Sequence, residues 1–303
     1  MRTLECLILA LVVATTAYAQ NTAESTPADV HALEKFATLN PNSAIAWENL
    51  GLARYQQQRF ALAAEAFEHA QRLAPRDAQI INNLGFAYLF GDRWDEAITS
   101  FKAALEINSN MTAPRRGLCS AYSLARRSNE AVQMCLAAIA DDANSAVPRY
   151  FLAHTYLDIG DGPKAIATFE DAARLEPAAK IYVGLAFAYY TVKNYNRALA
   201  SLQQAKELDP STPELLSGLG AVYAQLRDYK KAEGVLRQAV EREPDHVADH
   251  FNLGMVCLLE KNRDCALSEY NVLRMKSDPL AKTLLDNIDS NKVIDVNAFK
   301  ARQ

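Results

Sequence analysis

The sequence repeats itself in two consecutive stretches, AIAWENLGLARYQQQRFALAAEAFEHAQRLAPRD (residues 44–77) and AQIINNLGFAYLFGDRWDEAITSFKAALEINSNM (residues 78–111). They align without a gap over 34 residues, and five further frames follow at the same spacing, except for one step of 33. Self-similarity at a period of 20 to 50 residues is the signature of a repeat array. We therefore expect seven repeats: 44–77, 78–111, 112–145, 146–178, 179–212, 213–246 and 247–278.

Two columns of this alignment are identical in every frame. One is leucine: Leu50, Leu84, Leu118, Leu152, Leu185, Leu219 and Leu253. The other is alanine, thirteen residues later: Ala63, Ala97, Ala131, Ala165, Ala198, Ala232 and Ala266. A small residue follows each leucine, and in most frames a large residue and a second alanine lie four and seven residues after the first alanine. Apolar residues at i, i+4 and i+7 share one face of a helix. Each repeat is thus predicted to be a pair of antiparallel helices that cross at small residues.

The columns of the first frame that match a known repeat are Trp47, Leu50, Gly51, Ala63, Phe67, Ala70 and Pro75. This pattern resembles the tetratricopeptide repeat. The resemblance implies an all-α, right-handed α-solenoid with a capping half-repeat at 29–43 and a capping helix and tail at 279–303. It also implies a scaffold without catalytic activity, although the family serves in many unrelated pathways.

The first nineteen residues have the features of a secretory signal peptide. Arg2 precedes an apolar stretch at 6–14, and Ala17-Tyr18-Ala19 forms a small-x-small cleavage site. We expect cleavage near Ala19, a flexible leader at 20–28, and a periplasmic or secreted protein. The alternative is an uncleaved membrane anchor, but nine apolar residues fall short of the ~20 that span a bilayer. No membrane insertion is expected after signal removal.

Composition argues against several other classes of function. The formal net charge is −4 and the basic residues are scattered, whereas a nucleic-acid surface needs a basic stripe. Common catalytic and phosphate-binding motifs are missing, so we expect no enzyme and no cofactor. His246 and His250 lie four residues apart and would offer a metal two ligands, but His250 occupies the packing column of Trp47. We therefore expect no metal site.

Four cysteines remain after the signal peptide. Cys257 and Cys265 flank the turn of the seventh helix pair and are expected to face each other, so a disulfide is favoured there. Cys119 and Cys135 also lie on paired helices, but their columns are expected to be about one turn out of level. For both pairs the alternative is a buried free thiol.

The first helices of the repeats are expected to line an apolar groove, in columns where the repeat pattern needs nothing large. The candidate groove residues are Leu52, Tyr55, Phe86, Leu89, Phe90, Tyr150, His154, Phe187, Tyr190, Phe251 and Met255. Such a lining indicates a protein or peptide partner. The alternatives are a lipid or another small apolar ligand, or a role as accessory subunit of an envelope enzyme or assembly. A further alternative is that tight curvature of the array, or the protein's own tail, covers these side chains.

Overall fold

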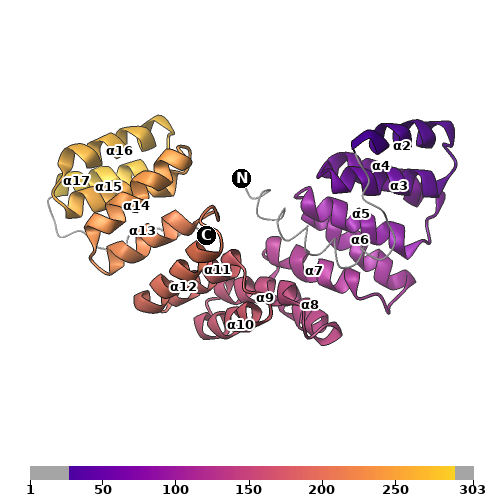
Figure 1. Cartoon of the computed structure of the whole chain (residues 1–303), viewed down its shortest axis with the longest axis horizontal. Coiled ribbons are helices and arrows are strands. Elements are labelled where there is room, and N and C mark those ends of the chain that lie inside the picture. Colours follow the sequence, from indigo (N-terminus) through magenta and orange to yellow (C-terminus); the bar gives the residue numbers. More distant parts are fainter. Residues whose placement is uncertain (1–26, 291–303) are drawn as a thin grey trace. The chain divides into compact units, whose positions relative to one another are not determined.

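The computed structural model of the protein describes residues 27–290 (Figure 1). The predicted signal peptide, most of the predicted leader and the tail after residue 290 lie outside these residues. Between residues 27 and 290, sixteen helices and no strand are present. The predicted all-α fold is thereby confirmed. No helix in this part of the chain combines the length and the apolar character that a membrane crossing requires.

The chain forms two compact units, with the boundary between Asp161 and Gly162. This boundary falls inside the fourth predicted repeat, between its two helices. The first unit contains α2 (Pro27–Leu39), α3 (Ala44–Gln56), α4 (Phe60–Leu73), α5 (Ala78–Phe90), α6 (Trp94–Ile107), α7 (Ala113–Leu124), α8 (Ser128–Asp141) and α9 (Ala146–Asp158). Consecutive helices pack as antiparallel neighbours (Figure 1).

The second unit follows the same plan. It contains α10 (Gly162–Leu175), α11 (Ala179–Thr191), α12 (Tyr195–Leu208), α13 (Leu215–Gln225), α14 (Tyr229–Arg242), α15 (Val247–Leu259), α16 (Arg263–Met275) and α17 (Leu280–Ser290). The helix α13 is shorter than its counterparts because it begins at Leu215, whereas the repeat frame begins at Pro213.

Each helix pair is joined by a turn with one residue in the left-handed conformation. In the first pair this residue is Gln58, with a φ of 61°, and the next amide, of Arg59, donates to the carbonyl of Arg54 at 2.9 Å. Such a back-bond satisfies carbonyls that the helix end leaves open. Only the fourth pair uses a glycine here, Gly160, although glycine adopts this conformation most readily.

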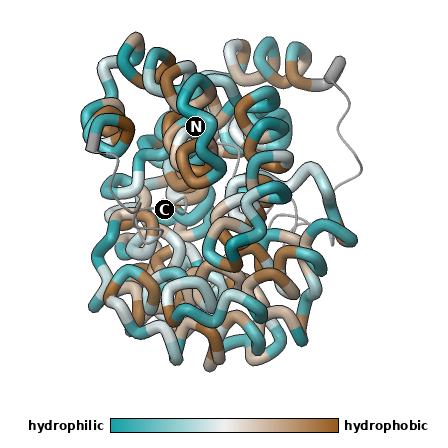
Figure 2. Tube along the Cα trace, turned by 90° about the vertical axis from the view of Figure 1, so that its left-hand side faces the viewer, coloured by the Kyte–Doolittle hydropathy of each residue, from teal (hydrophilic) through white to brown (hydrophobic). Residues whose placement is uncertain are grey.

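The helices of a pair cross where the sequence places small residues. The seven alanines of the identical column are fully buried, and the seven leucines are 1–6% exposed. At the first crossing, a Cβ atom added to Gly51 would lie 2.7 Å from the ring of Phe67, so only glycine fits at this contact. Figure 2 shows apolar and polar residues alternating along the helices. Packing across these crossings is the main source of apolar burial in each unit.

Both predicted capping helices are present. At the front, α2 buries Val30 and Ala37 against the first pair, and it begins at Pro27, two residues before the predicted start. Proline is favoured in the first turn of a helix, where its missing amide donor costs nothing. At the rear, Leu284 and Ile288 of α17 pack in the cluster formed by α15 and α16.

Candidate functional site

The predicted groove residues of the first unit pack largely against one another. Tyr55 lies edge-on to Phe60 and to Phe90, with ring centroids 5.4 and 5.8 Å apart, and Phe90 lies 5.5 Å from Phe60 and 6.4 Å from Phe86. Phe90 is only 7% exposed, and Leu89 is also buried. The expectation that these aromatic columns have no structural duty is therefore wrong for this unit, because Phe60 of α4 completes an aromatic cluster with them.

Five predicted groove residues of the first unit are partly exposed: Leu52, Tyr55, Phe86, Tyr150 and His154. Leu52 and Phe86 pack at the edge of the cluster around Phe67 and Phe101. Tyr150 and His154 of α9 stack edge to face, with ring centroids 4.5 Å apart.

Two predicted groove residues near the end of the second unit are buried, which corrects their assignment. Phe251 and Met255 of α15 are fully buried. They belong to the cluster that contains Leu236, Leu253 and Leu284. Because α14, α16 and α17 all contribute to this cluster, both side chains serve the core of this end of the chain, and neither is available to a ligand.

The second unit contains an open pocket at Phe187 and Tyr190, two of the predicted groove residues. Its cavity volume is about 40 Å³, and α11, α12 and α13 supply its walls. The rest of the lining is not among the residues predicted from the sequence: Val183, Ala186, Leu202, Glu214, Gly218, Ala221 and Val222. Small residues on α13, together with its late start, leave this space open. Short side chains at Gly218 and Ala221 were the available sequence signal.

Two polar features mark the rim of this pocket. Gln225 donates to the hydroxyl of Tyr190 at 3.1 Å and fixes the ring, while burial raises the pKa of that hydroxyl. Glu214, directly before α13, has a φ of 63° and so adopts the left-handed conformation. A residue with a side chain pays of order 1 kcal/mol or more for this conformation, which this chain also uses in the turns of six repeats. The pocket is thus an apolar hollow with one acidic residue in its lining.

Two charged groups on the first helices of the first unit have shifted pKa values. Burial, followed by the nearby charge of Asp77, raises the pKa of Glu48, which accepts a hydrogen bond from Asn83 at 3.3 Å. Burial lowers the pKa of Arg116, and the Nε atom of this guanidinium is buried without a hydrogen-bond partner. Neither group has the paired geometry of an acid–base site.

The two spaced histidines make contacts with neighbouring protein groups. His246 Nδ1 lies 2.6 Å from Asp249 Oδ2, and His250 Nδ1 lies 2.6 Å from Glu269 Oε2. His250 also contacts the carbonyl of Pro244 at 3.0 Å, so both of its ring nitrogens are engaged. Among residues 27–290, the group with metal-ligand spacing contains neither histidine.

Comparison with known families decides what kind of repeat this is. Sequence models described as tetratricopeptide repeat match residues 30–78 and 150–213, residues 78–111, and residues 189–254. Together they cover 30–111 and 150–254, which is more than half of the chain. The chain is a tetratricopeptide repeat protein. Its fold is that of a protein–protein interaction scaffold.

Solved structures agree with this family at low sequence identity. The APC/C hetero-tetramer Cut9–Hcn1 has a TM-score of 0.65 and 17% identity over 74% of this chain, but only 45% of that chain is covered. A tetratricopeptide repeat protein from Parabacteroides merdae ATCC 43184 has a TM-score of 0.62 and 15% identity, covering 81% of this chain and 98% of that one. The pilF protein of Pseudomonas aeruginosa has a TM-score of 0.57 and 18% identity, covering 67% and 92%. No curated protein sequence matches the chain significantly.

The tetratricopeptide frame explains the position of one cysteine pair. In the structure Cys119 and Cys135 form a disulfide, with Cα atoms 4.6 Å apart. They occupy the two columns that hold Gly51 and Phe67 in the first repeat, and these columns oppose each other directly at the helix crossing. The expectation that they lie one turn out of level is therefore wrong. A covalent bond replaces the glycine–aromatic contact in this repeat.

The second cysteine pair lies where the sequence places it. Cys257 of α15 and Cys265 of α16 are bonded across the turn of the seventh repeat, with Cα atoms 5.8 Å apart. Cys257 is fully buried, whereas Cys265 is partly exposed. The two disulfides thus belong to different environments, one in the core of a crossing and one near the surface.

Proposed function

We propose that this tetratricopeptide repeat protein is a non-enzymatic scaffold that binds a peptide or protein segment at the pocket around Phe187 and Tyr190. The observation that carries the proposal is the pocket itself, which lies on the first helices, α11 and α13, and is walled mainly by apolar side chains. Exposed apolar surface that is hollowed and rimmed by polar groups is typical of an interaction site. One apolar side chain of the partner would enter the hollow, with the flanking segment lying along α11 and α13.

The size of the pocket favours a peptide over a lipid. Its volume of about 40 Å³ has room for the end of one side chain. Pockets that enclose whole small ligands have volumes of about 300–1,000 Å³ by the usual measures. A lipid or another whole small ligand would need a larger cavity than this one.

Because of the aromatic cluster of the first unit, we propose that fewer residues bind the partner than the sequence predicts. Since Tyr55, Phe86 and Phe90 pack against one another, their exposed edges have less apolar area to offer a ligand. Tyr150 and His154 are likewise partly exposed, and they contact each other with ring centroids 4.5 Å apart.

We further propose that the scaffold acts outside the cytoplasm. Arg2, the apolar stretch at 6–14 and the Ala17-Tyr18-Ala19 motif support this location. Two disulfide pairs support it as well, because structural disulfides persist mainly in oxidising compartments. Cell fractionation with N-terminal sequencing tests the proposal: a mature chain beginning at Gln20 is expected, and an intact Met1 in the cytosol would contradict it.

Affinity capture with matched variants tests the binding site. The mature chain, immobilised, is incubated with an envelope extract of its own cells, and bound proteins are quantified by mass spectrometry. Phe187→Ala removes an aromatic wall of the pocket, and a buried aromatic contact at an interface contributes about 2 kcal/mol, or about thirtyfold in affinity. The control is Leu208→Ala, which removes an apolar side chain that is 49% exposed and lies outside the pocket.

A second variant separates loss of binding from loss of folding. Gly218→Ala adds a methyl group to the pocket wall, 3.1 Å from Cδ2 of Leu202, and also raises helix propensity. We expect one partner protein to bind the Leu208→Ala chain as well as the unchanged chain, and to be depleted from both the Phe187→Ala and the Gly218→Ala chains. The melting temperature of the Gly218→Ala chain is expected not to fall. Equal recovery of every bound protein by all four chains would contradict the proposed site.

A further inference from the structure

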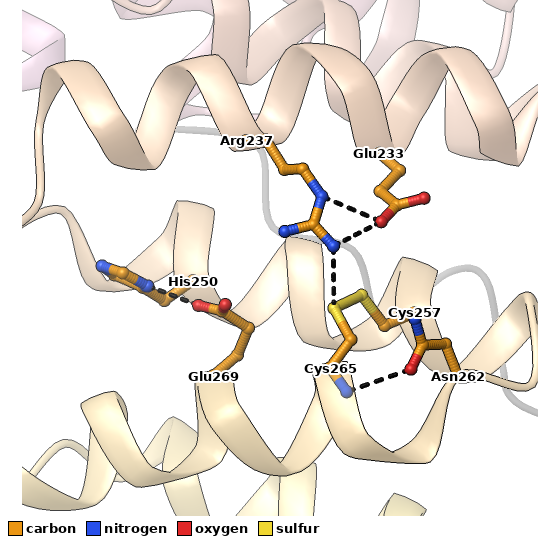
Figure 3. Close-up of a disulfide and its surroundings, with 7 residues drawn as sticks. All are labelled: Glu233, Arg237, His250, Cys257, Asn262, Cys265 and Glu269. Atoms are coloured by element: carbon orange, nitrogen blue, oxygen red, sulfur yellow. Dashed lines mark hydrogen bonds and ion pairs between the residues drawn. A yellow bond between two sulfur atoms is a disulfide. The ribbon is translucent and has the colours of Figure 1, made fainter.

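The two disulfides of this protein differ in accessibility. Cys119 and Cys135 are both fully buried. In the seventh repeat, Cys257 is fully buried but Cys265 is partly exposed, on the side of α16 that faces α14 (Figure 3). Of the four bonded cysteines, only Cys265 has exposed surface, so an external thiol would approach the second pair at this residue. This difference concerns a part of the molecule that the proposed binding pocket does not use.

Two features of the surroundings stabilise a thiolate at Cys265. Cys265 is the third residue of α16, and its amide donates to Oδ1 of the preceding cap residue Asn262 at 3.1 Å. The first turn of a helix carries a partial positive charge, which favours an anion there. In addition, Nη2 of Arg237 lies 3.5 Å from the Cys265 sulfur (Figure 3). A guanidinium at this distance favours the thiolate over the thiol.

The position of Cys257 has the opposite character. It lies in the last turn of α15, where the helix carries a partial negative charge, and no part of it is exposed. It packs in the apolar cluster with Leu253 and Met255. Burial in apolar surroundings disfavours a thiolate. The pair thus consists of a partly exposed cysteine, whose surroundings favour a thiolate, and a buried cysteine, whose surroundings favour the thiol.

We infer that Cys257 and Cys265 form a reversible thiol–disulfide exchange site for external thiols, with Cys265 as the sulfur that forms the mixed disulfide. A thiolate attacks the Cys265 sulfur, the Cys257–Cys265 bond breaks, and its electron pair leaves on Cys257, which takes a proton from water. In the mixed disulfide, a second external thiolate then attacks the sulfur that came from the first external thiol. This step releases the Cys265 thiolate and an external disulfide. Two external thiols are oxidised and one protein disulfide is reduced.

The carboxylates near the pair oppose the guanidinium in part. Arg237 also donates to Glu233 Oε1, at 2.9 Å from Nε and 2.6 Å from Nη2. This contact lowers the pKa of Glu233, and a hydrogen bond with Glu233 raises the pKa of Glu260. Lys230 lies beside Glu260. Further along α15 and α16, His250 and Glu269 point toward each other (Figure 3).

A metal ion fits this site less well than an external thiol. One oxygen of Glu233 and the sulfurs of Cys257 and Cys265 lie within 4.8 Å of one another, which is close enough for three ligands. However, Glu233 already pairs with Arg237, and the guanidinium contacts the exposed sulfur. A cation bound by the reduced pair would have to displace or repel this positive charge.

The first test compares the two disulfides within one molecule. The mature chain is oxidised with glutathione disulfide, treated under native conditions with reduced glutathione, quenched with iodoacetamide at intervals and mapped by mass spectrometry. We expect Cys257 and Cys265 to open at least about tenfold faster than the buried Cys119–Cys135 pair, and a glutathione adduct to accumulate on Cys265. Opening of both pairs at the same rate, or an adduct on Cys257, would overturn the inference.

The second test examines the role of Arg237 as a residue that stabilises the thiolate. In Cys257→Ser chains, which leave Cys265 as a single free thiol at this site, the rate of alkylation is followed against pH. Adding Arg237→Ala is expected to slow alkylation at about pH 7 by roughly threefold and to move the midpoint of the profile upward, while Arg237→Lys restores most of the rate. Cys265→Ser, which leaves the buried Cys257, is expected to react far more slowly.

Circular dichroism and an intact Cys119–Cys135 bond show that each variant is folded. A pH profile for Cys265 that is unchanged in a folded Arg237→Ala chain would remove Arg237 from the proposal. Equal reactivity of Cys257 and Cys265 in the two folded single-thiol chains would overturn the assignment of the exchanging sulfur.

Discussion

Replacing Gly117 by alanine should destabilise the first unit, although alanine is the better helix former. Gly117 lies on α7, against the ring of Phe101 from α6. A Cβ atom at this position would lie 2.6 Å from Cε2 of that ring. Carbon atoms in contact are normally about 3.5–4.0 Å apart, so the ring would have to move by about 1 Å. Phe101 cannot easily do so, because it is fully buried and Gly85 approaches it just as closely on α5.

The size of the effect follows from two opposing terms. Overpacking a filled core costs about 1–3 kcal/mol. Exchanging glycine for alanine inside a helix gains about 1 kcal/mol. The net cost of Gly117→Ala is therefore about 0–2 kcal/mol. In a unit of this length, 1 kcal/mol corresponds to about 2–4 °C in melting temperature.

The matched control is Gly234→Ala in the second unit. Gly234 lies inside α14, and a Cβ atom there would meet no other atom within 4 Å. This variant should gain the helix-propensity term alone, about 1 kcal/mol. Thermal melts followed by circular dichroism should thus show a higher melting temperature for Gly234→Ala and an unchanged or lower one for Gly117→Ala, and Phe101→Leu should partly rescue Gly117→Ala. Stabilisation by Gly117→Ala equal to that by Gly234→Ala would refute the packing account.

Three further changes test other parts of the structure. Replacing Cys119 and Cys135 together by alanine should cost about 3 kcal/mol under oxidising conditions, because their bond closes a loop with a separation of 16 residues; melts with and without reductant measure this. His250→Gln should destabilise the protein more at acidic than at alkaline pH: the hydrogen bond with Glu269 raises the pKa of His250 above 6.5, so its stabilisation is fully present below about pH 6.5 and lost as the pH rises through the raised value. A stability gap that grows with pH would contradict this. Ala131→Leu, at the fully buried crossing of α7 and α8, should cost about 1–3 kcal/mol, and an unchanged melting temperature would count against this packing.

The fold could be predicted because every repeat has the same residues at the positions where its two helices pack. The leucine and alanine columns recur at positions that must be buried for two helices to cross, and the structure buries all of them. The turns between the paired helices were less visible. Six of the seven repeats place a residue with a side chain, such as Gln58 or Asp92, in the left-handed conformation, so no glycine marks the turn.

The candidate site could be predicted only in part, because exposure depends on neighbours from other columns. Phe90 occupies an inward column, but Phe60, which the repeat pattern does not specify, covers it. Met255 is buried by helices that follow it in the chain. The pocket at Phe187 depends on where α13 begins, and the left-handed conformation of Glu214 that accompanies this late start is not encoded by the repeat.

Photo-crosslinking from the pocket tests the central claim that a partner binds the second unit at Phe187. The mature chain carries p-benzoylphenylalanine in place of Phe187, or in place of the exposed Gly234 on α14 as the control, and is irradiated in its own cells. We expect a specific crosslinked species from position 187 that is absent at position 234 and disappears with Gly218→Ala. Crosslinks from position 234 alone would contradict it, because the partner would then bind a different face of the unit.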